Sequence, residues 1–211
     1  MADPTARGAT ARAEASSGLS EAVLRGLREG AVILLGAVAV LLFAALVTWH
    51  PADPGFTFTG EGGEVRNLGG RRGAWLADTL YFLFGGPAYL FPAMLGAAAF
   101  WAYRRRDPEA EAPSRASTAL RVGGFVITLV AACAIAALHF RPGELREGAG
   151  GVVGTVAGDW MLGNFNFVGG TLLLLAAGMA GLSLASGLSW LGVIEDRKSR
   201  RLNSSHANIS Y

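Results

Sequence analysis

The side chains that most often carry out chemistry in proteins are few in this chain and stand far apart. Its histidines, His50, His139 and His206, do not have the spacing of metal ligands. Cys133 is the one cysteine, so it cannot form an intrachain disulfide. The only lysine, Lys198, follows Asp-Arg and not the glycine loop of a phosphate-binding motif, and GxSxG, HExxH and CxxC are all missing. The sequence therefore predicts no catalytic, cofactor-binding or metal site in this chain.

Asp78 is the ionisable residue whose position most needs an explanation. It follows two arginines and three glycines where a long apolar segment begins, in NLGGRRGAWLADTLYFLFG at 67–85. One interpretation is a proton or ion pathway across a membrane. The other, which we favour, is a carboxylate at the start of a helix, where unpaired N–H groups stabilise it by about 0.3–1 kcal/mol. In that case Arg71 or Arg72 could pair with it.

The elements that must position these residues are long uncharged segments. The chain has 211 residues, of which 52% are hydrophobic and 16% charged, whereas soluble domains have about 25% charged residues. A membrane-spanning helix needs about 20 mostly apolar residues, and four segments meet or approach that length. Four such segments in one short chain favour a membrane protein over a soluble helical core. We predict an all-α membrane protein with transmembrane helices near 30–49, 79–102, 121–139 and 168–190.

The distribution of basic residues predicts the orientation of these spans. The N-terminal tail and the loop 104–121 hold nine basic residues, against five in the loops 49–74 and 139–167. Because cytoplasmic loops are enriched in Lys and Arg, both termini are expected in the cytoplasm. Residues 1–19 are rich in Ala, Arg and small polar side chains and are expected to be a disordered cytoplasmic tail.

The second span contains residues that should distort a helix. Gly85, Gly86 and Pro87 lie near its middle, and Pro92 follows. Each proline removes one backbone donor and crowds the preceding turn. We therefore predict one kinked helix here, which neighbouring helices can accommodate in a membrane.

Glycines and other small residues mark the last part of the chain. Gly150, Gly154 and Gly158 would share one face if their segment is helical, so this segment is either a short interfacial helix or an irregular glycine loop. In the fourth span, small residues recur at every fourth position and predict close helix packing. The residues of this stripe are Ala177, Gly181, Ala185 and Ser189.

The segment 67–85, preceded by HPADPGF and followed by the proline-bearing second span, resembles the N-terminal four-helix membrane domain of the FtsK/SpoIIIE family of DNA translocases. GGVVG at 150–154 and GLSW at 187–190 also fit that domain, and the resemblance covers about residues 20–194. It implies that the motif residues have a structural role. These residues are Gly69, Gly70, Gly73, Trp75, Asp78, Pro87 and Pro92.

The resemblance implies a septum-targeting anchor in the bacterial inner membrane that serves cell division and chromosome segregation. Members of the family pump DNA with a cytoplasmic hexameric ATPase that lies beyond a linker. We therefore expect this chain to be no enzyme itself, and ATP, Mg²⁺ and DNA to be bound only by a motor domain that is missing here. Expected partners are the lipid bilayer, further copies of the chain and other septal membrane proteins. The alternatives are a small four-span transporter or channel subunit, or a scaffold protein complete at this length.

The segment from residue 195 onward, EDRKSRRLNSSHANISY, differs in composition from the rest of the chain. It resembles the conceptual translation of a sequencing adapter, except at Arg200. We expect residues 196–211 to be derived from such an adapter, and the chain to be truncated before the motor. A native basic segment beside the membrane is the alternative.

Overall fold

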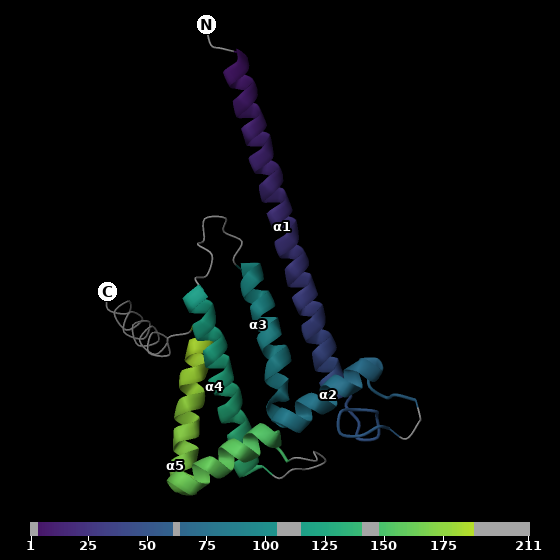
Figure 1. Cartoon of the computed structure of the whole chain (residues 1–211), viewed down its shortest axis with the longest axis vertical. Coiled ribbons are helices and arrows are strands. Elements are labelled where there is room, and N and C mark those ends of the chain that lie inside the picture. Colours follow the sequence, from purple (N-terminus) through teal and green to yellow (C-terminus); the bar gives the residue numbers. More distant parts are fainter. Residues whose placement is uncertain (1–3, 61–63, 105–114, 141–147, 188–211) are drawn as a thin grey trace, which may run out of the picture. The chain divides into compact units, whose positions relative to one another are not determined.

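The computed structural model describes residues 4–60, 64–104, 115–140 and 148–187. These residues form helices and connecting loops, and none of them lies in a β-strand. Figure 1 shows the order of the helices along the chain. The elements are α1 (Pro4–Val47), α2 (Gly70–Phe84), the short 3₁₀-helix η1 (Gly86–Tyr89), α3 (Leu90–Arg104), α4 (Arg115–His139) and α5 (Gly151–Ser186).

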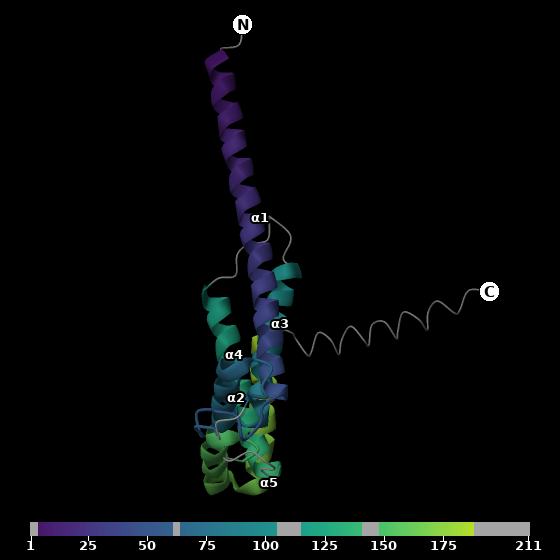
Figure 2. The same cartoon turned by 90° about the vertical axis from the view of Figure 1, so that its right-hand side faces the viewer.

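The chain divides into two compact units. One comprises Met1–Thr79 and Tyr89–Glu111, and within it α1 packs against α3. The other comprises Leu80–Ala88 and Ala112–Tyr211, and within it α4 packs along α5, as the views in Figures 1 and 2 both show. The first unit therefore contains the helix pair α1 and α3, and the second contains the pair α4 and α5.

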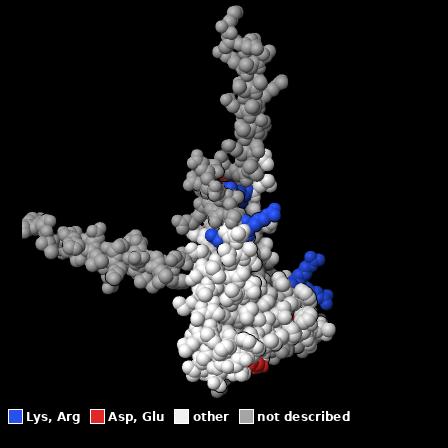
Figure 3. Space-filling model, turned by 60° about the vertical axis from the view of Figure 1, so that its left-hand side comes forward, with Lys and Arg blue, Asp and Glu red and all other residues white. Residues whose placement is uncertain are grey.

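Three helices are long and apolar enough to cross a membrane by length and composition. They are Gly26–Val47 of α1, the whole of α4, and α5. The helical fold class is thus confirmed, while the bounds of the four spans stay a prediction. Helix α3 has only 15 residues. The described surface in Figure 3 is largely free of charged side chains, and the basic ones lie at its edges.

The N-terminal boundary of the first helix differs from the prediction. Helix α1 continues back to Pro4, across a segment where the sequence analysis expected no helix. Residues 4–17 contain five alanines and two arginines, and both residue types are good helix formers. The disorder of residues 1–19 in solution stays a prediction, as does the origin of residues 196–211, which lie outside the described residues.

The prediction of one kinked helix for the second span was wrong. Two α-helices stand there, α2 and α3, separated by η1. Gly85 ends α2 in the left-handed region at φ 61°, where its N–H donates to the carbonyl oxygen of Tyr81 at 2.8 Å. Glycine adopts this conformation without a steric penalty. The apolar stretch is therefore interrupted completely at the glycine pair, and Pro87 lies inside η1.

Helix α5 also consists of two parts. Asn166 has φ 58° and ψ 176°, which is not helical, and it separates residues 151–165 from residues 167–186. Figure 1 shows α5 changing direction sharply, so that its second part runs beside α4. The glycine-rich segment before the fourth span is therefore a helix and not an irregular loop. We call α2 and residues 151–165 the two connector helices.

Candidate functional site

The most highly organised polar region in the described chain surrounds Asp78. The carboxylate is only 8% exposed. Its Oδ2 accepts hydrogen bonds from the backbone N–H of Thr57 at 2.7 Å and from the Thr57 hydroxyl at 2.8 Å. Its Oδ1 accepts one from the indole N–H of Trp49 at 3.3 Å. We call these three residues the Asp78 clamp, because they fasten the loop after α1 to α2.

The position of Asp78 corrects the capping hypothesis. Helix α2 begins at Gly70, so Asp78 lies in its third turn and not at its start. The hydrogen-bond partners of Asp78 in the described structure are Trp49 and Thr57, not Arg71 or Arg72. The sequence placed the helix start too late because the arginines were assigned to the preceding loop.

Gly55 lies directly against the clamp. A Cβ atom at this residue would come within 2.5 Å of the Asp78 carboxylate. The N–H of Gly55 donates to the carbonyl oxygen of Phe58 at 2.7 Å, which closes the turn that presents Thr57. Any larger residue at Gly55 would therefore displace the carboxylate from its donors.

A second buried carboxylate holds the other end of the same loop. Asp53 accepts hydrogen bonds from the backbone N–H groups of Arg66 and Asn67, both at 3.0 Å. Because a buried carboxylate without donors is unfavourable by several kcal/mol, these two bonds fix the return of the loop towards α2. The sequence analysis missed Asp53, although an aspartate before Pro-Gly is a recognisable turn signal.

Asn67 joins the loop to the end of α1. Its side-chain amide donates to the carbonyl oxygen of Ala45 at 2.7 Å, and its side-chain oxygen accepts from the N–H of Gly69 at 2.8 Å. Ala45 is among the last residues of α1, whose carbonyl groups have no partner within the helix. Leu68 adds a bond from its N–H to the Thr48 hydroxyl at 3.0 Å. The loop is thus ordered by specific side chains at both ends.

The predicted motif glycines lie beside this network. A Cβ at Gly73 would lie 2.8 Å from the Asn67 side-chain oxygen and 3.4 Å from the Ala45 Cβ. A Cβ at Gly69 would lie 2.8 Å from the Cα of Gly73. Gly70 has φ 63°, where a side chain would be strained. These glycines let α2 approach the end of α1 closely.

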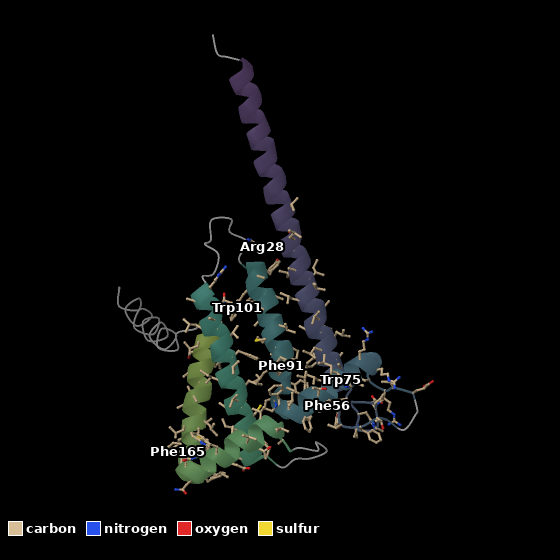
Figure 4. The ribbon with its side chains drawn as sticks, viewed as in Figure 1. Arg28, Phe56, Trp75, Phe91, Trp101 and Phe165 are labelled. Atoms are coloured by element: carbon tan, nitrogen blue, oxygen red, sulfur yellow. The ribbon has the colours of Figure 1, made fainter. Side chains whose placement is uncertain are left out.

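Two aromatic residues cover the outside of this region. The rings of Phe56 and Trp75 meet edge to face with centroids 6.2 Å apart, and Figure 4 shows the two side by side. Trp75 is 50% exposed. Amphipathic rings of this kind favour the headgroup zone of a membrane. Pro92, the last predicted motif residue, lies buried in α3.

The small residues of the fourth span lie where α5 meets α4. A Cβ at Gly124 of α4 would lie 2.6 Å from the backbone of Gly181 and of Ala185. The Thr128 hydroxyl lies 3.5 Å from the carbonyl oxygen of Gly178, one residue after Ala177. Helices approach this closely only when small residues line the contact.

The candidate chemical residues are not assembled into a site. No group of three or more His, Cys, Asp or Glu residues that could hold a metal occurs within the described residues. The His139 ring contacts Phe167 with centroids 4.9 Å apart. Cys133 is buried in α4, and its thiol donates to the carbonyl oxygen of Phe84 at 3.4 Å. His206 and Lys198 lie outside the described residues.

Fold and site together define a helical multi-pass membrane domain whose buried polar residues order the loop between α1 and α2. Residues 24–198 match the family model described as the 4TM region of DNA translocase FtsK/SpoIIIE. The chain belongs to this family, and the family match together with the apolar helices identifies it as an inner-membrane multi-pass protein.

Three relatives show how far this similarity extends. The chain is 41% identical over 157 residues to the DNA translocase FtsK of Vibrio parahaemolyticus, which covers 74% of this chain and 15% of the relative. It is 36% identical over 184 residues to that of Shewanella oneidensis, with 85% and 20% covered. For Pseudomonas putida the identity is 35% over 170 residues, with 80% and 20% covered. The chain thus spans at most a fifth of the length of these relatives. No solved structure matches it.

Proposed function

We propose that this chain anchors a DNA translocase in the bacterial inner membrane at the division septum, where it serves cell division and chromosome segregation. The family match and the relatives named DNA translocase FtsK support this role. Membrane insertion, self-association and contact with other septal membrane proteins are the tasks of the anchor. DNA binding and ATP hydrolysis with Mg²⁺ belong to the motor of the whole protein.

The proposed topology has four spans with both termini in the cytoplasm. Gly26–Val47, Arg115–His139 and residues 167–186 provide three spans. The fourth is η1 followed by α3, which together rise about 30 Å at roughly 2.0 Å per 3₁₀ residue and 1.5 Å per α residue. That length matches an apolar core of about 30 Å. The Arg distribution then assigns the loops that contain the connector helices to the external side.

The observation that supports the anchoring role is that the buried polar side chains form hydrogen bonds within the loop and its neighbouring helices. Asp53, Asn67 and Asp78 are all buried, and each is satisfied by hydrogen bonds that shape the external loop. No buried side-chain nitrogen or oxygen in the described residues is left without a partner. Transport sites present polar groups to a cavity, whereas these buried groups hold a loop in one conformation.

A localisation experiment tests this function. The chain carrying a fluorescent protein at its N-terminus should accumulate at the septum of dividing cells. Asp78→Leu should leave the protein in the membrane but spread it evenly, because the loop loses the hydrogen bonds that hold it against α2. Asp159→Leu, an exposed carboxylate on the other connector helix, is the matched control and should still reach the septum. An even membrane signal from the parent chain would refute the proposal, and septal Asp78→Leu would refute the role of the loop.

A further inference from the structure

The two connector helices begin with similar sequences. Residues 68–78 read LGGRRGAWLAD and residues 149–159 read AGGVVGTVAGD. A glycine pair, a third glycine and a terminal aspartate occur at the same positions in both. Four identities in so short a segment do not establish a repeat, which requires that the backbone conformations match as well.

The backbone repeats the same unusual conformations at the same positions. Gly70 and Gly151, the first residues of the two connector helices, both have φ 63°. The helices end at Gly85 with φ 61° and at Asn166 with φ 58°, and each of these residues lies equally far from its starting glycine. Asn166 is the one described residue other than glycine with a positive φ. Left-handed residues are uncommon, so this agreement at both ends is not expected from unrelated segments.

The packing against the preceding helix is repeated as well. In the first half of the domain, residues 26–104, a Cβ at Gly73 would lie 3.4 Å from the Ala45 Cβ. In the second half, residues 115–187, a Cβ at Gly154 would lie 3.3 Å from the Ala137 Cβ. Ala45 and Ala137 both stand two residues before the end of their helix, in an Ala-Ala-Leu sequence. Each connector helix therefore crosses the end of its own long helix through the same pair of positions.

The end of the first connector helix is docked on the start of the second. The N–H of Gly86 donates to the carbonyl oxygen of Ala149 at 2.9 Å. A Cβ at Gly151 would lie 2.5 Å from the backbone of Leu83, and a Cβ at Gly85 would collide with the Ala149 carbonyl. Asn166 has a Cβ at the position equivalent to Gly85, so the end of the second connector helix cannot dock on another helix start in this way.

We propose that the domain is a tandem duplication of one two-span repeat, and that the two halves defined above are its two copies. Each repeat consists of a span, a connector helix entered through Gly-Gly, a left-handed exit residue and a second span. Since each repeat crosses the membrane twice, both have the same orientation, unlike inverted repeats, and both connector helices lie at the same external interface. The proposal deepens the four-span topology given above and names residues 151–165 as a second interfacial element that contacts lipid headgroups.

The test places the arginine pair of the first connector helix at the equivalent positions of the second. Val152 and Val153 occupy the positions of Arg71 and Arg72. The double variant Val152→Arg/Val153→Arg should insert into membranes and be purified in detergent as a folded protein with a melting midpoint close to that of the parent. Arginine is tolerated there because this helix lies at headgroup depth.

The matched control places the same adjacent pair in the following span of α5. Leu172→Arg/Leu173→Arg should lose most of the inserted protein, although Leu172 is 63% exposed, because these side chains face the bilayer core. Loss of the Val152/Val153 variant to the same extent would overturn the duplication, and so would full insertion of the control pair. Because the experiment measures membrane insertion and not septal localisation, its result can be interpreted even if the proposed septal role is wrong.

Discussion

The two halves of the domain use one backbone plan but fasten their connector helices differently. In the first half, polar side chains of a long loop hold α2 from outside, through Asp78 and Asn67. In the second half, residues 151–165 contact α4 directly, and a Cβ at Gly150 or Gly154 would collide with the carbonyl oxygen of Cys133. Both connector helices contact the preceding helix, but side-chain hydrogen bonds to a loop are added in the first half, and a closer approach to backbone is made in the second.

This difference gives the equivalent aspartates of the two halves different roles. Asp159 stands at the position of Asp78 but is exposed. A carboxylate at this place is therefore structural only when a loop supplies donors to it. The first half has a loop ordered by side-chain hydrogen bonds, while the second half relies on glycine and has no described equivalent of the Asp78 clamp.

The largest effect is expected from a bulky residue in the glycine contact of the second half. Gly154→Leu places a side chain against the backbone of Cys133, where neither helix can yield without moving. Overpacking of this kind is unfavourable by about 3 kcal/mol or more when the obstacle is backbone. We expect most of the protein to be lost from the detergent-soluble, monodisperse fraction on size-exclusion chromatography.

Gly163→Leu is the matched control in the same connector helix, because no atom lies within 4 Å of a Cβ at that residue. It should elute like the parent. A soluble Gly154→Leu variant with an unchanged melting midpoint would contradict the direct contact between α5 and α4.

A smaller effect is expected from the Asp78 clamp. Asp78→Leu leaves the donors of Thr57 and Trp49 without an acceptor, and such a change is unfavourable by about 2 kcal/mol. Asp78→Asn should fall in between, because it keeps one acceptor oxygen but introduces an NH₂ group among donors. Asp159→Leu should stay within about 0.5 kcal/mol of the parent, as exposed substitutions usually do. Thermal unfolding in detergent measures all three, and equal losses in Asp78→Leu and Asp159→Leu would remove the difference between the halves.

The smallest effect is expected from Asn67→Ala. The variant loses two hydrogen bonds, but water can reach part of the loop once the side chain is shortened, so the loss should be about 1 kcal/mol. Proteolysis should reveal it more clearly than melting, because the loop 49–69 opens locally before the helices unfold. Faster cleavage in this loop, with α4 and α5 intact, is the predicted pattern. Unchanged cleavage kinetics would show that Asn67 does not hold the loop.

The sequence was sufficient for the helical fold class because uncharged segments long enough for a membrane are visible without any tertiary information. The sequence predicted a kink where α2 in fact ends and α3 begins. The glycine and proline residues indicated distortion, but whether a helix bends or ends there depends on the contact between Gly85 and Ala149, which is distant in sequence.

The polar site was the least predictable part. Asp78 was recognised as unusual, yet its partner Thr57 is separated from it by 20 residues, and only the last eight of these belong to α2. No periodicity connects such residues, since a loop brings them together only after the helices have packed. The equivalence of the two connector helices was also hidden, because four shared positions become significant only when Gly70 and Gly151 prove to have the same backbone conformation.

The central claim is that both connector helices lie outside the same membrane face. In a Cys133→Ala background, Trp75→Cys and Val156→Cys occupy equivalent positions of the two connector helices and are 50% and 67% exposed in the parent chain. A membrane-impermeant maleimide should label both in intact spheroplasts, whereas Arg115→Cys at the start of α4 should be labelled only after permeabilisation. Labelling of one connector position and protection of the other would contradict the account.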